Sequence, residues 1–274
     1  MKDEQINLAK QFIKDADAVL ITAGAGMGVD SGLPDFRGNE GLWTAYPPIK
    51  KLGLDFKQME SSSLFRTNPQ LAWGFYGHRI NLYRKNQPNK SFEILKKLIK
   101  NKEYFIFTSN VDTHFQKANF PEEKIYEIHG SIEYLQCIDN CNKKIIKNTL
   151  GQIDVDMSTL TTEDIPLCKK CSQPLMPNIL MFGDGVFNET NVIKQNTRFR
   201  KWLLDIKDMN LVIIEIGVGT TIPTIRNFND TRTRTNKNCK LIRINPKEYQ
   251  TLNINDIGIQ GRGLDVMNKI AISY

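Results

Sequence analysis

Four cysteines form two close pairs whose spacing suits a metal site. Cys137 and Cys141 are separated by three residues, Cys168 and Cys171 by two, and 26 residues lie between the pairs. Four thiolates in two pairs can close a tetrahedral shell around Zn²⁺ without leaving a position for water. The spacing therefore predicts a structural zinc site, and the alternative is four unrelated reduced thiols. The fifth cysteine, Cys239, stands alone.

A glycine-rich turn follows an apolar run near the start of the chain. Residues 18–22 (AVLIT) read as a buried strand that leads directly into the turn GAGMG at residues 24–28. Glycines at such a turn let the backbone approach a pyrophosphate, and the start of the following helix offers N–H groups. The dehydrogenase fingerprint is not met, because Val29 takes the third glycine position and a polar loop follows. A phosphate cradle is predicted, with a purely structural turn as the alternative.

Two of the three histidines are candidates for acid–base chemistry. His129 follows a short apolar stretch, and His114 lies beside Asn110 and Asp112. Imidazole titrates near pH 6.5, which suits a general base at neutral pH. On the residues alone, a core or surface histidine and a pair of turn-forming polar residues are the alternatives.

Five stretches, taken in order, resemble one known family. They are GAGMGVDSGLPDFRG at residues 24–38, TSNVDTHFQKA from Thr108, IHGS from Ile128, PNILMFGD from Pro177, and GVGTT from Gly217 followed by IRIN ending at Asn245. Together they resemble the sirtuins, NAD-dependent protein-lysine deacylases, of bacterial type, over about residues 18–267. The implied reaction removes an acyl group from protein lysine and releases nicotinamide and O-acyl-ADP-ribose. The cysteine pairs fall where that family carries its structural zinc.

The resemblance implies roles for individual residues. His129 becomes the general base that takes a proton from a ribose hydroxyl, and His114 is more structural. Asn110 orients the ribose or a water, Asp112 holds the nicotinamide carboxamide, and Phe36 shields the reactive carbon from water. The implied cofactor-binding residues are Gly24, Ala25, Gly26, Gly28, Asp35, Phe36, Arg37, Ser109, Asn110, Asp112, Gly217, Thr220, Thr221, Asn245 and Gly263.

The stretch from residue 177 to 184 is implied to bind the acylated substrate. Its extended backbone would pair with a substrate peptide by strand addition. Ile179 and Leu180 would line the tunnel for the acyl-lysine, with Phe182 and Gly183 also implied in substrate binding.

Tyr76 and Arg79 lie three residues apart on a predicted helix, so they project from one face. The pair resembles the Y-x-x-R pattern of sirtuins that accept succinyl or malonyl lysine. A guanidinium fork and a phenol suit a terminal carboxylate. The alternative is the partly exposed surface of an amphipathic helix.

Three positions depart from the family pattern. Ser109 stands in place of glutamine, Thr113 in place of glycine, and Asp184 in place of glutamate. These departures keep open an NAD-dependent protein ADP-ribosyltransferase or NAD hydrolase on the same fold. A zinc-stabilised module that binds a nucleotide without turning it over is a further alternative. Retention of all three implied catalytic residues argues against it.

Strand-like and helix-like stretches alternate along the chain. Besides residues 18–22, the runs 104–108, 211–216 and 240–244 read as strands, and helices are predicted over 5–16, 68–85 and 91–100. This alternation predicts an α/β fold with a doubly wound parallel sheet and a second lobe supplied by insertions. The resemblance implies that the sheet is Rossmann-like and of sirtuin type, with a smaller zinc-binding and helical lobe. We expect one catalytic domain over residues 1–274. Its large NAD-binding lobe comprises about 1–38, 88–131 and 178–274, and its small lobe comprises about 39–87 (helical) and 132–177 (zinc-binding).

Composition narrows the class of protein. With 274 residues, 40% of them hydrophobic, the chain buries one substantial core, which excludes general disorder. The net charge of +7 is small and scattered, so no nucleic acid partner is expected. Neither a membrane-spanning run nor the features of a signal peptide are evident. We expect a cytoplasmic monomer, without a membrane partner, that acts on acyl-lysine proteins or peptides.

Overall fold

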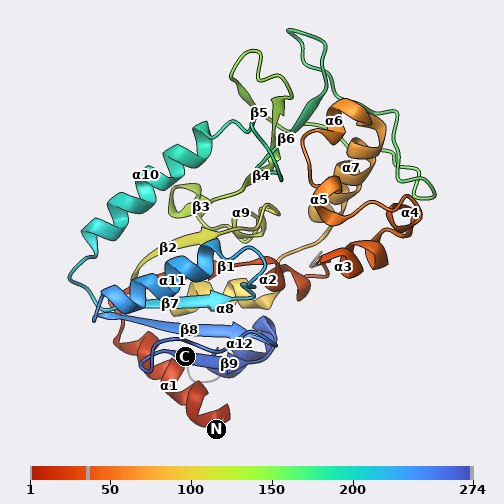
Figure 1. Cartoon of the computed structure of the whole chain (residues 1–274). Helices are drawn as coiled ribbons and strands as arrows, with labels where there is room; N and C mark the ends of the chain where they lie inside the picture. The colour runs from red at the N-terminus through yellow and green to blue at the C-terminus, as the bar shows by residue number, and fades with distance from the viewer. Residues whose placement is uncertain (1, 35–37, 272–274) are drawn as a thin grey trace.

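The computed structural model describes residues 2–34 and 38–271, which are organised around a six-stranded parallel sheet (Figure 1). Its strands are β1 (Ala18–Ala23), β2 (Glu103–Thr108), β3 (Ile125–Glu127), β7 (Leu211–Ile216), β8 (Cys239–Asn245) and β9 (Ile257–Gln260). They lie in the order β3-β2-β1-β7-β8-β9, with every neighbouring pair parallel. The chain builds outward from β1 on one side and then on the other. The sheet is therefore doubly wound, with its switch point between β1 and β7, as predicted.

Two layers of helices cover the sheet, because alternate side chains of each strand face opposite sides. On one side, α1 (Lys2–Asp15), α8 (Lys90–Leu98) and α12 (Gly263–Ala271) pack on Val19 and Ile21 of β1. On the other, α10 (Thr190–Asp205) and α11 (Thr224–Thr235) pack on Ala18 and Leu20 (Figure 1). All six residues of β1 and of β7 are buried. The four strands predicted from continuous apolar runs are thereby confirmed, while the short β3 and β9 were not predicted.

A second, antiparallel sheet lies apart from the first (Figure 1). It has the order β5-β4-β6, with β4 (Gly130–Cys137), β5 (Ile145–Lys147) and β6 (Leu175–Ile179). Its core is shared with a group of helices that includes α7. These helices are α3 (Gly38–Ala45), α4 (Pro47–Lys51), α5 (Phe56–Met59), α6 (Leu64–Thr67) and α7 (Pro69–Lys85). The short elements α2 (Ala25–Val29), α9 (His114–Lys117) and the 3₁₀ turn η1 (Glu122–Lys124) complete the set.

Helix α7 is fixed at both ends. The Asn68 side chain accepts a hydrogen bond from the Leu71 N–H (3.1 Å), and Pro69 begins the helix, as the sequence predicts. At the other end, Lys117 Nζ of α9 donates to the carbonyl oxygens of Tyr83, Arg84 and Asn86 at 2.6, 2.9 and 3.0 Å. A cation at a helix C-terminus is favourable. The end of α7 is thereby tied to the segment that follows β2.

The predicted boundaries of the two lobes stay a prediction. The buried apolar residues form separate clusters, two of them on the faces of the parallel sheet and one between the antiparallel sheet and α7. Among residues 2–34 and 38–271, no helix has both the length and the apolar character needed to cross a bilayer.

Candidate active site

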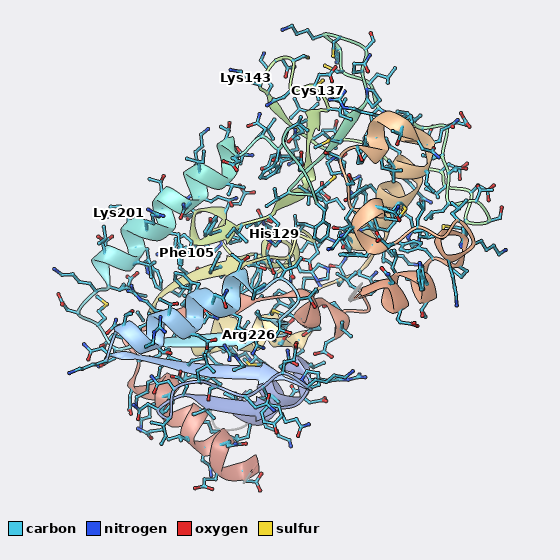
Figure 2. The ribbon with its side chains drawn as sticks, viewed as in Figure 1. Phe105, His129, Cys137, Lys143, Lys201 and Arg226 are labelled. Carbon is cyan, nitrogen blue, oxygen red and sulfur yellow. The ribbon has the colours of Figure 1, made fainter. Side chains whose placement is uncertain are left out.

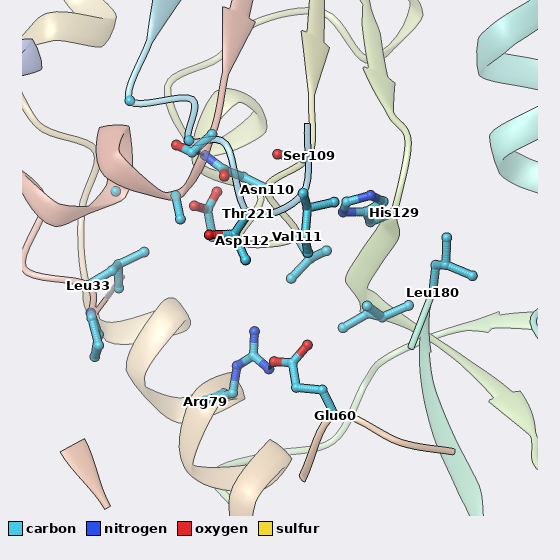
Figure 3. Close-up of a pocket in the computed structure, with 18 of the residues that line it drawn as sticks. Leu33, Glu60, Arg79, Ser109, Asn110, Val111, Asp112, His129, Leu180 and Thr221 are labelled. Atoms are coloured by element: carbon cyan, nitrogen blue, oxygen red, sulfur yellow. Dashed lines mark hydrogen bonds and ion pairs between the residues drawn. The ribbon is translucent and has the colours of Figure 1, made fainter. Parts of the chain in front are cut away.

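A cavity of about 340 Å³ lies at the carboxyl ends of β1, β2 and β7, between the two sheets (Figure 3). This is the sheet's switch point, where open α/β sheets bind ligands. The cavity falls in the size range of small-molecule sites. Thirteen predicted site residues line it: Gly24, Ala25, Gly28, Arg79, Ser109, Asn110, Asp112, His129, Ile179, Leu180, Phe182, Gly217 and Thr221.

Six other predicted residues lie outside this lining. Tyr76 and Asn245 are completely buried, and Gly263 packs against Ile216. Thr220 is exposed and donates a hydrogen bond to Glu248. Gly26 and Gly183 also lie off the cavity wall. Asp35, Phe36 and Arg37 fall outside the described residues, so their predicted roles stay predictions.

The glycine turn is clamped against the loop that follows β7. The Gly24 N–H donates to the Ile216 carbonyl and the Gly26 N–H to the Gly217 carbonyl, both at 3.1 Å. A Cβ on Gly24 would lie 2.8 Å from the Gly217 oxygen, so this close approach requires glycine. These two N–H groups therefore join the two loops instead of facing a phosphate, which refines the expected cradle.

The loop after β7 is held from behind by buried side chains. Asn245 Nδ2 and Arg226 Nη2 both donate to the Val218 carbonyl oxygen at 2.9 Å. The Asn245 Oδ1 accepts from the N–H groups of Lys247 and Glu248, both at 3.0 Å. Both polar atoms of the Asn245 amide thus have partners within the protein. Asn245 does not line the cavity, and its predicted role in cofactor binding stays a prediction.

The loop after β2 carries two of the predicted catalytic residues. Asn110 Nδ2 donates to the Gly24 carbonyl oxygen (3.0 Å), and Asp112 Oδ1 accepts from the His114 N–H (2.9 Å). Burial raises the pKa of Asp112, while the neighbouring His114 opposes this shift. Thr113 has φ of 58°, a left-handed conformation that favours glycine. The family departure at this position therefore places strain beside the site.

His129 lies between β3 and β4 and lines the cavity beside Ser109 and Val111 (Figure 3). Burial lowers its pKa below the ordinary value, opposed by a hydrogen bond with the Ser109 backbone and by the negative charge of Glu60. The imidazole is consequently neutral at physiological pH, which is the form that accepts a proton.

His114, the rival candidate, is only 1% exposed and packs against Phe92, with ring centroids 6.0 Å apart. Neither ring nitrogen has a hydrogen-bond partner in the part of the chain that the structure describes. It does not line the cavity.

Arg79 reaches the cavity wall and forms an ion pair with Glu60, and its Nε and Nη2 donate to the Tyr83 hydroxyl at 3.2 and 3.0 Å. Tyr76 lies beneath this wall with no exposed surface, and its hydroxyl has no hydrogen-bond partner among the described residues. The alternative of a partly exposed helix surface is wrong, because Arg79 is 5% exposed and Tyr76 is fully covered. The carboxylate-binding role of the pair stays a prediction.

The predicted substrate segment runs from β6 into the cavity wall. Ile179 is buried, whereas Leu180 is 42% exposed at the mouth. The Leu180 N–H donates to the His129 carbonyl (2.9 Å), and the Phe182 N–H donates to the Glu60 carbonyl (2.8 Å). These bonds fix the segment between the histidine and the residue after α5.

Sequence reasoning missed several lining residues, chiefly Glu60, Tyr83 and Val111. Val111 lies inside the stretch TSNVDTHFQKA and Tyr83 is four residues after Arg79, so both had a positional signal. Glu60 had none, because it belongs to an irregular connection whose placement depends on a distant segment.

The four paired cysteines converge at the far end of the small sheet, where Figure 2 shows Cys137 well away from His129. Their sulfur atoms all lie within 4.8 Å of one another, with Cys137 Sγ 3.5 Å from Cys171 Sγ and Cys141 Sγ 3.6 Å from Cys168 Sγ. These separations are too long for disulfides and suit ligands of one ion with Zn–S bonds of about 2.3 Å. The four-cysteine cluster is compatible with zinc, as predicted. Cys239 is buried in β8 and takes no part.

Comparison with known proteins gives a family match and related sequences. The model of the Sir2 family matches residues 24–220. A probable bifunctional ADP-ribose hydrolase/ADP-ribosyltransferase of Fusarium oxysporum f. sp. cubense is 28% identical over 87% of this chain and 42% of its own length. An NAD-dependent protein deacylase of Aquifex aeolicus is 30% identical over 61% of this chain and 62% of its own. The alignments thus span about two fifths and three fifths of these two relatives.

A third relative is covered more fully. A protein ADP-ribosyltransferase of Staphylococcus aureus is 27% identical over 92% of this chain and 81% of its own length. Among solved structures, a mutant Sir2 homologue in complex with ADP ribose is 24% identical, with a TM-score of 0.72 over 96% of this chain and 94% of that chain. At this level of identity the structural likeness shows the fold.

Proposed function

The chain belongs to the Sir2 family, and on this premise we propose that it uses NAD to remove acyl groups from lysine side chains of proteins. The observation that carries the proposal is one cavity that joins the glycine turn, Asn110, Asp112 and His129 to the apolar side chains of Ile179 and Leu180. Names of relatives support the reaction, since several are NAD-dependent protein deacylases.

The residues present fit NAD. The glycine turn approaches the loop after β7 so closely that a Cβ on Gly24 or Gly217 would collide with backbone, which leaves bare main chain at the switch point. NAD, when bound, supplies an ADP-ribosyl group with nicotinamide as its leaving group. Gly24, Ala25, Gly28, Gly217 and Thr221 line the part of the cavity where its phosphate and ribose groups would lie.

The side chains around the cavity have three kinds of role, which are accepting a proton, positioning loops and contacting the substrate. Neutral His129 accepts a proton from a hydroxyl at the cavity wall, because its buried ring favours the uncharged form. Asn110 keeps the loop after β2 in contact with the glycine turn. Asp112 fixes the start of α9 by accepting the His114 N–H. Leu180 and Ile179 provide apolar surface for the methylene chain of the acylated lysine.

Zinc, held by Cys137, Cys141, Cys168 and Cys171, would stabilise the second sheet. The cluster closes a four-sulfur shell and lies away from the cavity, so we assign it no part in the reaction.

Protein ADP-ribosylation is the second candidate function. Two relatives carry ADP-ribosyltransferase in their names. The departures at Ser109, which lines the cavity, and at Thr113, which is strained, are the features of this chain that favour it.

One experiment separates the two candidates. The protein is incubated with NAD and with acetyl-, succinyl- and unmodified-lysine peptides of one sequence, and the products are identified by mass spectrometry. Deacylated peptide with O-acyl-ADP-ribose supports the deacylase. Added ADP-ribose on protein, or free ADP-ribose without deacylation, favours the transferase or the hydrolase. A His129→Ala variant serves as the control for each product.

Several finer expectations remain proposals. We propose that the protein is a monomer and acts in the cytoplasm on acyl-lysine proteins or peptides. We also propose that it binds no nucleic acid and that it is divided into a large and a small lobe. Acceptance of an acidic acyl group, which the Tyr76 and Arg79 pair predicts, depends on the partners that Arg79 already has in the cavity wall.

A further inference from the structure

The ion pair between Glu60 and Arg79 points to a specificity-determining role for Glu60. We propose that the Glu60 carboxylate occupies the position beside Arg79 that the carboxylate of an acidic acyl group would need. The site then accepts uncharged acyl groups and rejects those that end in a carboxylate. The inference rests on the proposed deacylase function and concerns its substrate class.

Both partners of the pair belong to the cavity wall. Figure 3 shows Glu60 and Arg79 facing each other across the cavity from Asn110, Asp112 and His129. The side chain of Arg79 is 7% exposed and that of Glu60 is 14% exposed. Most of the surface of both side chains is therefore removed from water. Buried opposite charges remain closely paired, because water no longer solvates them.

The surroundings of Arg79 make the pairing strong. Its guanidinium carbon lies 5.3, 5.2 and 5.5 Å from the ring centroids of Phe75, Tyr76 and Tyr83. Its remaining donors include Nε and Nη2, which bind the Tyr83 hydroxyl. Aromatic walls screen charge poorly compared with water, so Glu60 offsets the positive charge of Arg79 directly.

Glu60 is also held in place through its backbone. Its carbonyl accepts the Phe182 N–H (2.8 Å), and the next residue, Ser61, forms a parallel bridge with Phe182. On its other side, α5 begins at a capping box in which Asp55 accepts the Gln58 N–H (2.8 Å). The carboxylate therefore projects from a segment that is fixed at both sides.

An incoming acyl carboxylate would consequently meet Glu60 as well as Arg79. Two carboxylates sharing one guanidinium in a poorly screened pocket repel each other, and one must leave or take up a proton. An acetyl group brings no such charge. The wall then supplies a neutral pair that an uncharged acyl group contacts without displacing it.

The test measures binding, so that it does not depend on turnover. Fluorescently labelled acetyl-lysine and succinyl-lysine peptides of one sequence are titrated with wild type, Glu60→Gln, Arg79→Gln and the double variant. The expected ratio of succinyl to acetyl affinity rises in the order Arg79→Gln, wild type, double variant, Glu60→Gln. The step from wild type to Glu60→Gln should be about tenfold or more, the worth of one charge-assisted hydrogen bond.

Glu133→Gln is the matched control. Glu133 of β4 forms an ion pair (3.0 Å) with Arg84, which lies on α7 as Arg79 does. Neither Glu133 nor Arg84 lines the cavity. Loss of that pair should leave the affinity ratio unchanged. If Glu60→Gln does not fold, the order of the succinyl-to-acetyl affinity ratios in wild type, Arg79→Gln and the double variant still tests the proposal.

The outcomes separate the two proposals. Wild type that binds the succinyl peptide at least as tightly as the acetyl peptide overturns the role of Glu60. So does an unchanged ratio in Glu60→Gln and in the double variant. If neither peptide binds to wild type, and none is deacylated in the presence of NAD, the deacylase proposal itself fails.

Discussion

The side-chain amide of Asn110 donates a hydrogen bond to the carbonyl oxygen of Gly24, 86 residues earlier in the chain, at 3.0 Å. This bond ties the loop after β2 to the turn after β1. Both loops contribute residues to the cavity lining, among them Gly24 and Ala25 from one and Ser109 and Asp112 from the other. The Ser109 N–H and the Thr108 hydroxyl also donate to the Ala23 carbonyl oxygen, both at 3.2 Å, so Asn110 adds to this connection a side chain that itself lines the cavity.

Asn110→Ala should impair the reaction far more than the fold. Loss of one hydrogen bond is expected to lower the unfolding free energy by about 1 kcal/mol. A shift of about 1 Å between the loops is expected to lower kcat/KM by roughly a hundredfold. Nicotinamide release and thermal unfolding measure the two effects. The exposed Asn255 supplies the control, since Asn255→Ala should alter neither; comparable losses in both variants would contradict the assignment.

As the pH is lowered, the activity of wild type should begin to fall only at a pH below the ordinary histidine pKa of about 6.5. Burial lowers the pKa of His129, so its basic form persists as the pH drops through 6.5. The negative charge of Glu60 opposes that shift, and Glu60→Gln should move the acid limb to still lower pH. The pH dependence of kcat/KM with an acetyl-lysine peptide measures the acid limb of wild type and that of Glu60→Gln. A limb that moves upward in Glu60→Gln would argue against His129 as the base.

Glu127 makes stability depend on pH in a defined window. It is 3% exposed, and burial raises its pKa from 4.5 to about 7. Between these values the folded state binds more protons than the unfolded state. Stability should therefore fall as pH rises from about 4.5 to 7, by about 3 kcal/mol from this residue. Denaturant unfolding across this range should show the loss in wild type and in the exposed control Glu122→Gln, whereas Glu127→Gln should lack it.

Zinc content and stability should depend on the clustered cysteines and not on Cys239. Elemental analysis is expected to find about one zinc per chain, and Cys168→Ser should lose it. Loss of metal should lower the melting temperature by on the order of 10 °C, because the metal would join the two cysteine pairs at the end of the second sheet. Cys239→Ala should retain the metal. Protein purified without zinc yet equally stable would refute the site.

Much of the fold is predictable from the sequence because the central strands β1 and β7 are buried along their whole length and β2 and β8 along most of theirs. The runs that became β1, β2, β7 and β8 were recognised, and parallel packing then placed Asn110, Asp112 and Gly217 at one edge. Resemblance to a family supplied the role of His129, which the apolar pattern alone left open.

The rest depended on contacts that local sequence does not encode. The partly exposed surface of an amphipathic helix, which was the alternative for Tyr76 and Arg79, is wrong because α7 is buried nearly all round and Tyr76 lies beneath the cavity wall. Glu60 reaches the site through pairing of its segment with Phe182, more than a hundred residues later. Asn245 supports Val218 from behind, a contact that local sequence does not indicate, and its predicted contact with a ligand stays a prediction.

The position of β7 beside β1 has a consequence for how the protein is made. Asp17 and Asn210, which lie at the start of these two strands, are hydrogen-bonded at 3.0 Å across a separation of 193 residues. During translation, β1 and β2 emerge early, while the opposite edge of β1 lacks its partner until the insertions have been synthesised. Closing so long a loop is slow, and an unpaired apolar edge invites association with other chains. A nascent chain that stalls before β7 would therefore be a substrate for chaperones, because its central strand has one edge without a neighbour.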